Sequence, residues 1–224
     1  MTGKEYAKKK KKKISRQRRK ALLTREKILQ AARELFSEKG LDTTSIDDIT
    51  GRADVGKGSF YYHFKNKGVV IRTLISRMLK ELEEAMEDRC RGITHLRKTL
   101  EALIDVHTKF FCGRWEDFVL FFQGRTELTL RESYQGIEAP FVEYLEKIET
   151  IIEPAVKAHL PEHVLRRIAC AVAGMVSGYY SFAAVASDEA DIDKAFRSLR
   201  GAMAASLARF IQETTPTPKV GERE

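Results

Sequence analysis

Apolar residues recur along this chain at the three- and four-residue spacing of amphipathic helices. The first buried stripe is Ile28, Ala31, Ala32, Leu35 and Phe36. Thr24 precedes the stripe and can cap the helix, while Lys39 followed by Gly40 is a typical stop signal. A first helix is therefore expected from about Thr24 to Lys39.

Two short helices are expected next. Ser45 can cap the first of them, and Asp48, three residues later, can complete a capping box. This helix should end near Ala53, and the turn 54–56 leads into a third helix. Phe60 and Phe64 lie four residues apart, so they share one face of the third helix and can anchor it to a core.

The rest of the chain is predicted to be helical as well. Asn66 can cap a long fourth helix that carries Val70, Leu74 and Met78 on one face. Pro154 should break or kink a later helix. The further helices are expected over 93–111, 115–123, 139–160, 162–187 and 192–211. Since no alternating strand pattern exceeds four residues, the predicted fold class is all-α.

Charge is concentrated at the N-terminus. The whole chain carries +8, and residues 1–20 hold eleven Lys or Arg against Glu5 alone. That segment is therefore +10, which leaves −2 for residues 21–224. We expect residues 1–20 to be a disordered basic arm and residues 214–224 a disordered tail. The arm is either a solubilising tail or an element that contacts DNA phosphates or a minor groove.

Other classes of protein find little support. Cys90, Cys112 and Cys170 are widely spaced, and no metal-binding, nucleophile-elbow or phosphate-loop motif appears, so we expect no enzyme, metal or cofactor. Residues 168–187 are uncharged, but eleven of these twenty are Ala, Gly or Ser. A helix buried on all sides explains them better than a membrane span, so a cytoplasmic location without membrane contact is expected.

The third predicted helix has the side chains of a DNA reader. Opposite the two phenylalanines lie Lys57, Ser59, Tyr62 and His63, with Tyr61 at the edge of this face. Such hydroxyl, aromatic and basic groups contact phosphates and base edges.

Residues 24–70 also resemble the DNA-binding domain of the TetR family of transcriptional regulators. The matching positions are Ala31-Ala32, Leu35-Phe36, Gly40, Thr44, Ile49-Thr50, the whole run 53–64 and Lys67. Two departures occur at the turn, where Asp54 replaces the usual Gly and Gly56 replaces the usual Ser cap. Both residue types tolerate these positions.

The resemblance implies an N-terminal three-helix helix-turn-helix domain at 21–67, followed by a larger helical effector-binding and dimerisation domain at 68–213. In a helix-turn-helix, Lys57, Gly58 and Ser59 would meet base edges. The family pattern adds Tyr61 near bases or the adjoining phosphate, and Tyr62, His63, Lys67 and Thr44 on phosphates.

The resemblance also implies a homodimer and an effector pocket. The predicted interface residues are Gly174, Gly178, Phe196, Leu199, Met203 and Leu207; burial within one subunit is the alternative. The predicted pocket residues are His107, Phe111, Trp115, Phe118, Phe122, Arg125, Met175 and Tyr179; an ordinary core is the alternative. The effector would be a small apolar or amphipathic molecule.

The functional prediction is a ligand-responsive repressor that binds a palindromic double-stranded DNA operator as a homodimer. The alternative is a non-specific, nucleoid-type DNA-binding protein whose affinity comes from the lysine-rich arm.

Overall fold

The computed structural model describes residues 16–130, 136–156, 160–186 and 189–214, and within these ranges it is helical without strands. The predicted all-α class is confirmed. The elements are α1 (Arg16–Lys39), α2 (Ile46–Ala53), α3 (Lys57–His63), α4 (Lys67–Cys90), α5 (Leu96–Phe111), α6 (Trp115–Leu130), α7 (Glu138–Ile152), the 3₁₀ turn η1 (Glu153–Ala155), α8 (Glu162–Ala186) and α9 (Glu189–Thr214).

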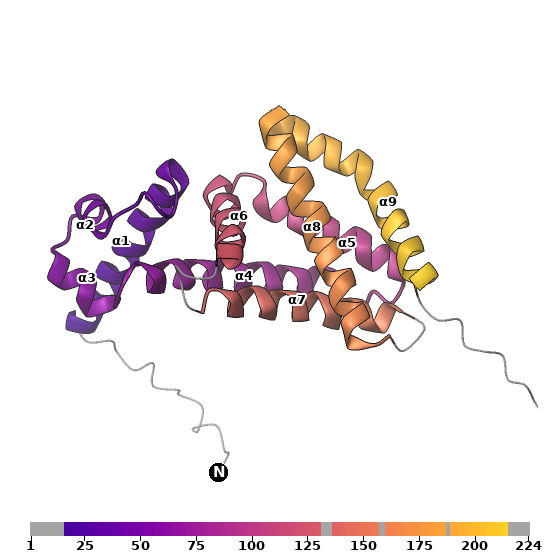
Figure 1. Ribbon diagram of the computed structural model, residues 1–224, viewed down its shortest axis with the longest axis horizontal. Helices are drawn as coiled ribbons and strands as arrows, with labels where there is room; N and C mark the ends of the chain where they lie inside the picture. Colours follow the sequence, from indigo (N-terminus) through magenta and orange to yellow (C-terminus); the bar gives the residue numbers. More distant parts are fainter. Residues whose placement is uncertain (1–15, 131–135, 157–159, 187–188, 215–224) are drawn as a thin grey trace, which may run out of the picture.

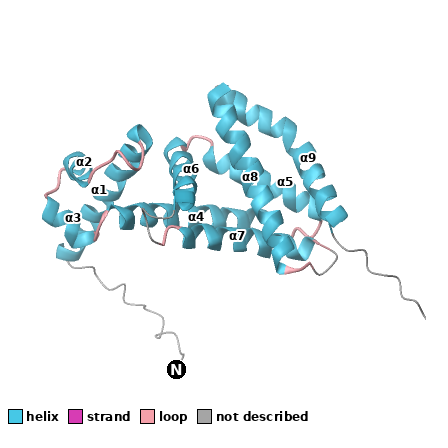
Figure 2. Cartoon of the chain, viewed as in Figure 1, coloured by secondary structure: helices cyan, strands magenta, loops and turns pink. Residues whose placement is uncertain are grey.

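Helices α1 to α3 form a small head at one end of the molecule, and α4 runs from this head into a larger body (Figure 1). Helix α7 lies along α4, while α5 packs against α4, α8 and α9. Helix α6 contacts both α1 and α4, so it bridges the body and the head. Figure 2 makes clear that only short loops join these helices within the described ranges.

Helix α1 begins earlier than the sequence suggested. It starts at Arg16, and the hydroxyl of Thr24 donates to the carbonyl of Lys20 at 3.1 Å instead of capping the helix. The expected disordered arm is therefore corrected for residues 16–20, which form a basic first turn of α1. Residues 1–15 of the predicted arm and 215–224 of the predicted tail lie outside the described residues.

Apart from the start of α1, the predicted helix ends in the head are confirmed. Ser45 and Asp48 form a reciprocal capping box at the start of α2, and the Asn66 side chain accepts from the backbone N–H of Val69 at 3.0 Å. Gly40 has φ +89°, the left-handed conformation that glycine adopts easily after a helix. The break expected at Pro154 appears as the end of α7 and the short turn η1.

Helix α8 corrects another expectation. Ile168, Val172 and Val176 are buried, but Gly174 and Phe182 are exposed, so this uncharged helix is not buried on all sides. Across the described ranges, every helix is too short or too polar to cross a membrane.

Candidate nucleic-acid interface

The third helix is held to the head by its two phenylalanines. Phe60 and Phe64 are 0% and 2% exposed, and their rings lie 5.9 Å apart against the core formed by α1 and α2. The predicted packing role of both residues is therefore confirmed. Because α3 has only seven residues, this tertiary anchoring rather than its own length keeps it helical.

The turn between α2 and α3 tolerates its unusual residues. Asp54 takes the left-handed conformation with φ 52°, and its N–H donates to carbonyls at the end of α2. Gly56 occupies the N-cap position of α3 without a side-chain cap, while its carbonyl accepts from Ser59 N at 2.9 Å. The backbone of the turn thus supplies the bonds that a Ser cap would otherwise provide.

The opposite face of α3 is open. Tyr61 and Tyr62 are 56% and 78% exposed, and Gly58 and Ser59 are also exposed. A methyl group built on Gly58 would meet no atom within 4 Å. Large exposed aromatic side chains beside an open glycine are costly for a surface with no partner.

Lys57 forms an ion pair on this face. Its Nζ lies 2.8 Å from Oδ1 of Asp47, a residue of the first turn of α2, and the carboxylate raises the pKa of Lys57. Asp47 was not predicted from the sequence, because its distance from Lys57 depends on the geometry of the turn 54–56 between α2 and α3. An acidic residue in the first turn of one helix and a lysine in the first turn of the next helix is the sequence signal that could have identified Asp47.

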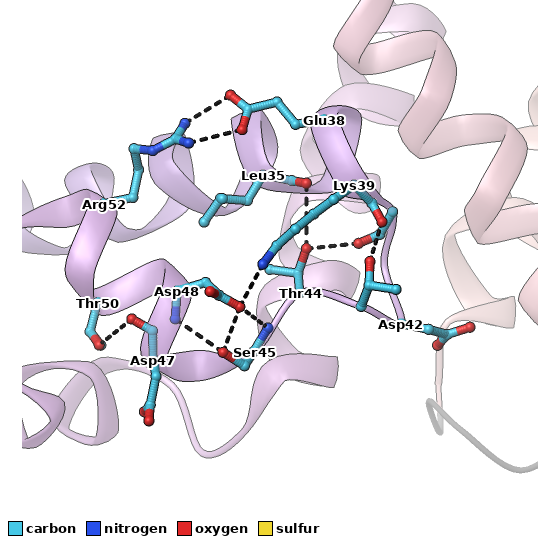
Figure 3. A network of polar contacts seen from close by, with 12 residues as sticks. Leu35, Glu38, Lys39, Asp42, Thr44, Ser45, Asp47, Asp48, Thr50 and Arg52 are labelled. Carbon is cyan, nitrogen blue, oxygen red and sulfur yellow. Dashed lines mark hydrogen bonds and ion pairs between the residues drawn. The ribbon is translucent and has the colours of Figure 1, made fainter.

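Thr44 was predicted to contact phosphate, but the structure places it inside the head. The side chain is 1% exposed, and its hydroxyl donates to the Gly40 carbonyl at 2.7 Å (Figure 3). These contacts do not support a phosphate contact through the Thr44 side chain. They fix the loop between α1 and α2, next to the Ser45 capping box.

Lys67 likewise has partners within the protein. Its Nζ donates to the carbonyls of Leu41, Asp42 and Thr44 at 2.8, 3.2 and 3.0 Å. An ammonium has three donors, so these bonds occupy all of them. Instead of a predicted phosphate contact, the structure gives Lys67 the role of tying the start of α4 to the loop that carries α2.

His63 lies between the open face and α1. Its ring makes an edge contact with Tyr62 at 4.9 Å, and burial, together with the nearby Arg25, lowers its pKa. Arg25 also covers the Phe64 ring at 5.0 Å. Residues 16–20 of α1, four of which are Arg or Lys, precede Arg25 and are all exposed.

In the body, the predicted pocket residue His107 is part of the core. It is 1% exposed, and its two ring nitrogens lie 2.6 Å from the Leu103 carbonyl and 2.6 Å from the Tyr144 hydroxyl. Because a carbonyl can only accept, Nδ1 carries the proton and Nε2 accepts from Tyr144. Burial lowers the pKa of His107 to about 4. His107 was expected to orient a ligand, but it bonds instead to Leu103 and Tyr144 within the core. Tyr144 was not predicted from the sequence.

The predicted aromatic residues divide between core and surface. Phe111 and Phe118 are buried and pack edge to face with ring centroids 5.7 Å apart, and Phe118 also lies 4.5 Å from Tyr180. Trp115 and Phe122, in contrast, are exposed. These four residues therefore do not line one enclosed space.

Of the remaining predicted pocket residues, Arg125 joins α6 to α8. Arg125 donates to the Ser177 hydroxyl at 2.8 Å and lies 5.3 Å from the Phe122 ring centroid. Met175 and Tyr179, on α8, are partly buried against the core. The two helices meet here through side chains, with a charged group next to aromatic rings.

Two hollows lie at the junction of head and body. One of about 260 Å³ is lined by charged residues of α1, α4 and α6, including Arg33, Arg77 and Asp117. The other, of about 360 Å³, separates the loop after α1 from α6 and is bordered by Phe122 and Gln123. The Gln123 side chain accepts from Leu41 N at 3.0 Å. Helix α6 therefore touches both the body core and the loop that carries α2.

The predicted dimer residues fall into three groups. On α8, added methyl groups at Gly174 and Gly178 would meet nothing within 4 Å, so both leave open space. On α9, Leu199 is exposed and Met203 is half-buried. Leu207 is buried against the core of its own subunit, which favours the single-subunit alternative for this residue.

Phe196 lies in α9, but its side chain is outside the described residues. Two residues that were not predicted extend the open surface of α8 and α9. Phe182 is 80% exposed, one turn after Gly178, and Phe210 is 48% exposed. Helices α8 and α9 themselves lie at the end of the body remote from the head (Figure 1).

Comparison with known proteins agrees with this arrangement. The family model described as "Bacterial regulatory proteins, tetR family" matches residues 28–72. The HTH-type transcriptional regulator YhgD of Bacillus subtilis is 30% identical over 144 residues, which cover 60% of this chain and 73% of YhgD. The HTH-type regulator YvdT of the same organism is 36% identical over 124 residues, which cover 55% of this chain but only 63% of YvdT, less than two thirds of its length.

The fold extends through the body. The structure of the regulator FadR from Bacillus subtilis in complex with stearoyl-CoA matches 81% of this chain and 96% of FadR with a TM-score of 0.63. The identity is 20%, so this similarity concerns the fold alone.

Proposed function

Because this chain belongs to the tetR family of bacterial regulatory proteins, whose members are transcriptional regulators that bind DNA, we propose that it is a homodimeric, ligand-responsive repressor. Two heads would bind the half-sites of a palindromic operator. The observation that carries this proposal is the open face of α3. Phe60 and Phe64 hold the helix from behind, while Gly58, Tyr61 and Tyr62 are exposed in front.

The proposed DNA contacts follow from this face. The first turn of α3 would enter the major groove, with Lys57, Gly58 and Ser59 at base edges and Tyr61 beside them. Tyr62 and His63 would bind the adjoining phosphates. Thr44 and Lys67 would support this surface from within the head, because their polar groups bind carbonyls there.

Dimerisation would use α8 and α9. One three-helix head makes few base contacts, so operator affinity requires two heads at a fixed separation. The open glycines of α8 permit close helix approach, and Phe182 and Phe210 supply apolar area beside them. Four helices, two from each subunit, would then form the interface.

The effector would act through α6. We place a small apolar or amphipathic molecule beside the Arg125–Ser177 contact that joins α6 to α8, with the partly buried Met175 and Tyr179 of α8 as further candidate contacts. Its insertion would displace α6, which holds the head through Gln123 and Leu41. A coupling free energy of about 1–3 kcal/mol would lower operator affinity roughly 5- to 150-fold.

The alternative is a non-specific DNA-binding protein that depends on the lysines of residues 1–20. Selection from random double-stranded DNA separates the two functions. A specific regulator should select one palindrome and prefer it to random duplex by roughly 10³-fold or more. A protein that binds all duplexes with similar affinity, or one that remains a monomer on DNA, would contradict the proposed function.

A further inference from the structure

The ion pair between α2 and α3 lies on the proposed reading surface. Asp47 and Lys57 are both well exposed, with 68% and 62% of their side chains accessible, and Oδ1 lies 2.8 Å from Nζ. In Figure 3 the Asp47 carboxylate points away from the capping network of Ser45 and Asp48. It is therefore not used to cap α2.

Stability of the head does not account for this pair. Exposed ion pairs contribute little to folding, and α2 already has its capping box. A carboxylate at a DNA surface also repels phosphates and so weakens non-specific binding. The dipole of α2 favours an acidic residue in its first turn, but that effect does not require the carboxylate to pair with Lys57.

The two side chains together place a hydrogen-bond acceptor, the Asp47 carboxylate, next to hydrogen-bond donors, the N–H groups of Lys57. Within the described part of the chain, Lys57 has no second hydrogen-bond partner, so two of its three donors remain available. Oδ2 of Asp47 likewise has no partner there. The major-groove edge of a G·C pair offers the complement: guanine O6 and N7 accept, and the cytosine N4 amino group donates.

We propose that Asp47 and Lys57 together read one G·C base pair in each half-site. Lys57 donates its two free N–H groups to guanine O6 and N7, and Asp47 accepts from cytosine N4. This inference rests on the proposed function and adds to it a residue of α2 as a determinant of specificity.

The other base pairs offer fewer hydrogen bonds to Lys57 and Asp47. With adenine in place of guanine, N7 still accepts from Lys57, but the N6 amino group meets the ammonium and thymine O4 meets the carboxylate. With thymine in place of guanine, O4 accepts from Lys57 and adenine N6 donates to Asp47, but the thymine methyl group replaces the N7 acceptor, so one Lys57 bond is lost. Reversing the pair to C·G places the amino group under Lys57 and the carbonyl under Asp47. Only guanine under Lys57 with cytosine under Asp47 therefore satisfies both free donors of Lys57 and the carboxylate together.

The test compares operator selection by the wild-type protein, Asp47→Asn and Lys57→Met. Asn carries both a donor and an acceptor, so Asp47→Asn should lose its preference at one symmetric pair of G·C positions. The discrimination there should fall roughly 10-fold, while the other positions stay unchanged. Lys57→Met should relax the same positions, and the double variant should lose less discrimination than the two single variants combined.

Glu38→Gln is the matched control. Like Asp47→Asn, it removes one negative charge from an exposed ion pair of the head, here the pair between Glu38 and Arg52. Glu38 and Asp47 lie on opposite sides of α2 in Figure 3. This control should keep the wild-type preference at every position. Unfolding midpoints of all variants establish that each head is folded.

The outcomes are distinguishable. If the wild-type protein selects a palindrome but Asp47→Asn keeps the same preference throughout, the paired reading is overturned and the proposed function stands. An A·T pair at the affected positions would also overturn it. A wild-type protein that selects no sequence would overturn both the proposed function and this inference.

Discussion

Gly58 offers a test in which protein stability and DNA affinity should change in opposite directions. It lies in the first turn of α3, has no positive φ, and an added methyl group would meet no atom within 4 Å. Gly58→Ala should therefore fold without strain. Replacing a helical glycine by alanine stabilises a protein by about 0.5–1 kcal/mol, a rise in Tm of a few degrees at this size.

Operator binding should weaken at the same time. If the backbone at Gly58 approaches the bases, the new methyl group occupies that space and displaces the first turn of α3. The expected decrease in affinity is roughly 10-fold, comparable to one base contact. Fluorescence anisotropy on the selected operator and a thermal melt measure both effects on the same preparations.

Gly51→Ala is the matched control. Gly51 lies in α2, also has open space around its α-carbon, and is outside the proposed contact set. It should gain similar stability and keep the operator affinity of the wild-type protein. A Gly58→Ala variant that is stabilised and binds the operator as well as the wild type would refute the close approach of α3 to DNA.

Three further predictions concern the arm, the interface and the core. Deleting residues 2–13, which precede α1, should weaken binding to every duplex and reduce the salt slope by about one for each phosphate that the arm neutralises; an unchanged slope would indicate a tail that does not bind DNA. Gly174→Arg should leave the monomer folded, because its surroundings are open, but should abolish the dimer in sedimentation; an intact dimer would move the interface elsewhere. His107 has its pKa lowered to about 4 from 6.5, so the unfolded chain binds the proton first and stability falls as pH drops from 6.5 towards 4, by about 2 kcal/mol between pH 7 and 5. Denaturant titrations of the wild type and His107→Gln should differ in this slope, and equal slopes would assign the pH dependence to other groups.

The head could be predicted largely from sequence because its structure depends on local signals. The capping box of Ser45 and Asp48, the cap at Asn66 and the spacing of Phe60 and Phe64 all involve residues within four positions of each other. Their chemistry does not require knowledge of distant contacts. The predicted start of α1 was wrong because the polar residues 16–20 carry no apolar stripe, although they extend the helix at its N-terminal end.

The body was harder to predict because its contacts join distant residues. His107 meets Tyr144, 37 positions later, and Arg125 meets Ser177, 52 positions later. A helical stripe identifies which residues turn inward but not which partner each one meets. The same limit applies to Lys67, whose three carbonyl partners lie 23 to 26 residues earlier.

Head and body are joined by polar contacts that an effector could alter. Arg33 of α1 lies 3.2 Å from Asp117 of α6, and burial raises the pKa of Asp117. Gln123 of α6 adds its bond to Leu41 N. A shift of α6 would therefore change the orientation of α1 and the loop before α2 together, which would change the separation of the two heads in the proposed dimer.

The proposed function depends above all on two heads that read one palindrome together. Native mass spectrometry gives the number of protomers bound to the selected palindrome, and fluorescence anisotropy gives the affinity. Both are compared with a duplex that carries a single half-site. We expect two protomers on the palindrome and an affinity for the half-site duplex lower by orders of magnitude. One protomer per palindrome, or equal affinity for both duplexes, would contradict the proposed function.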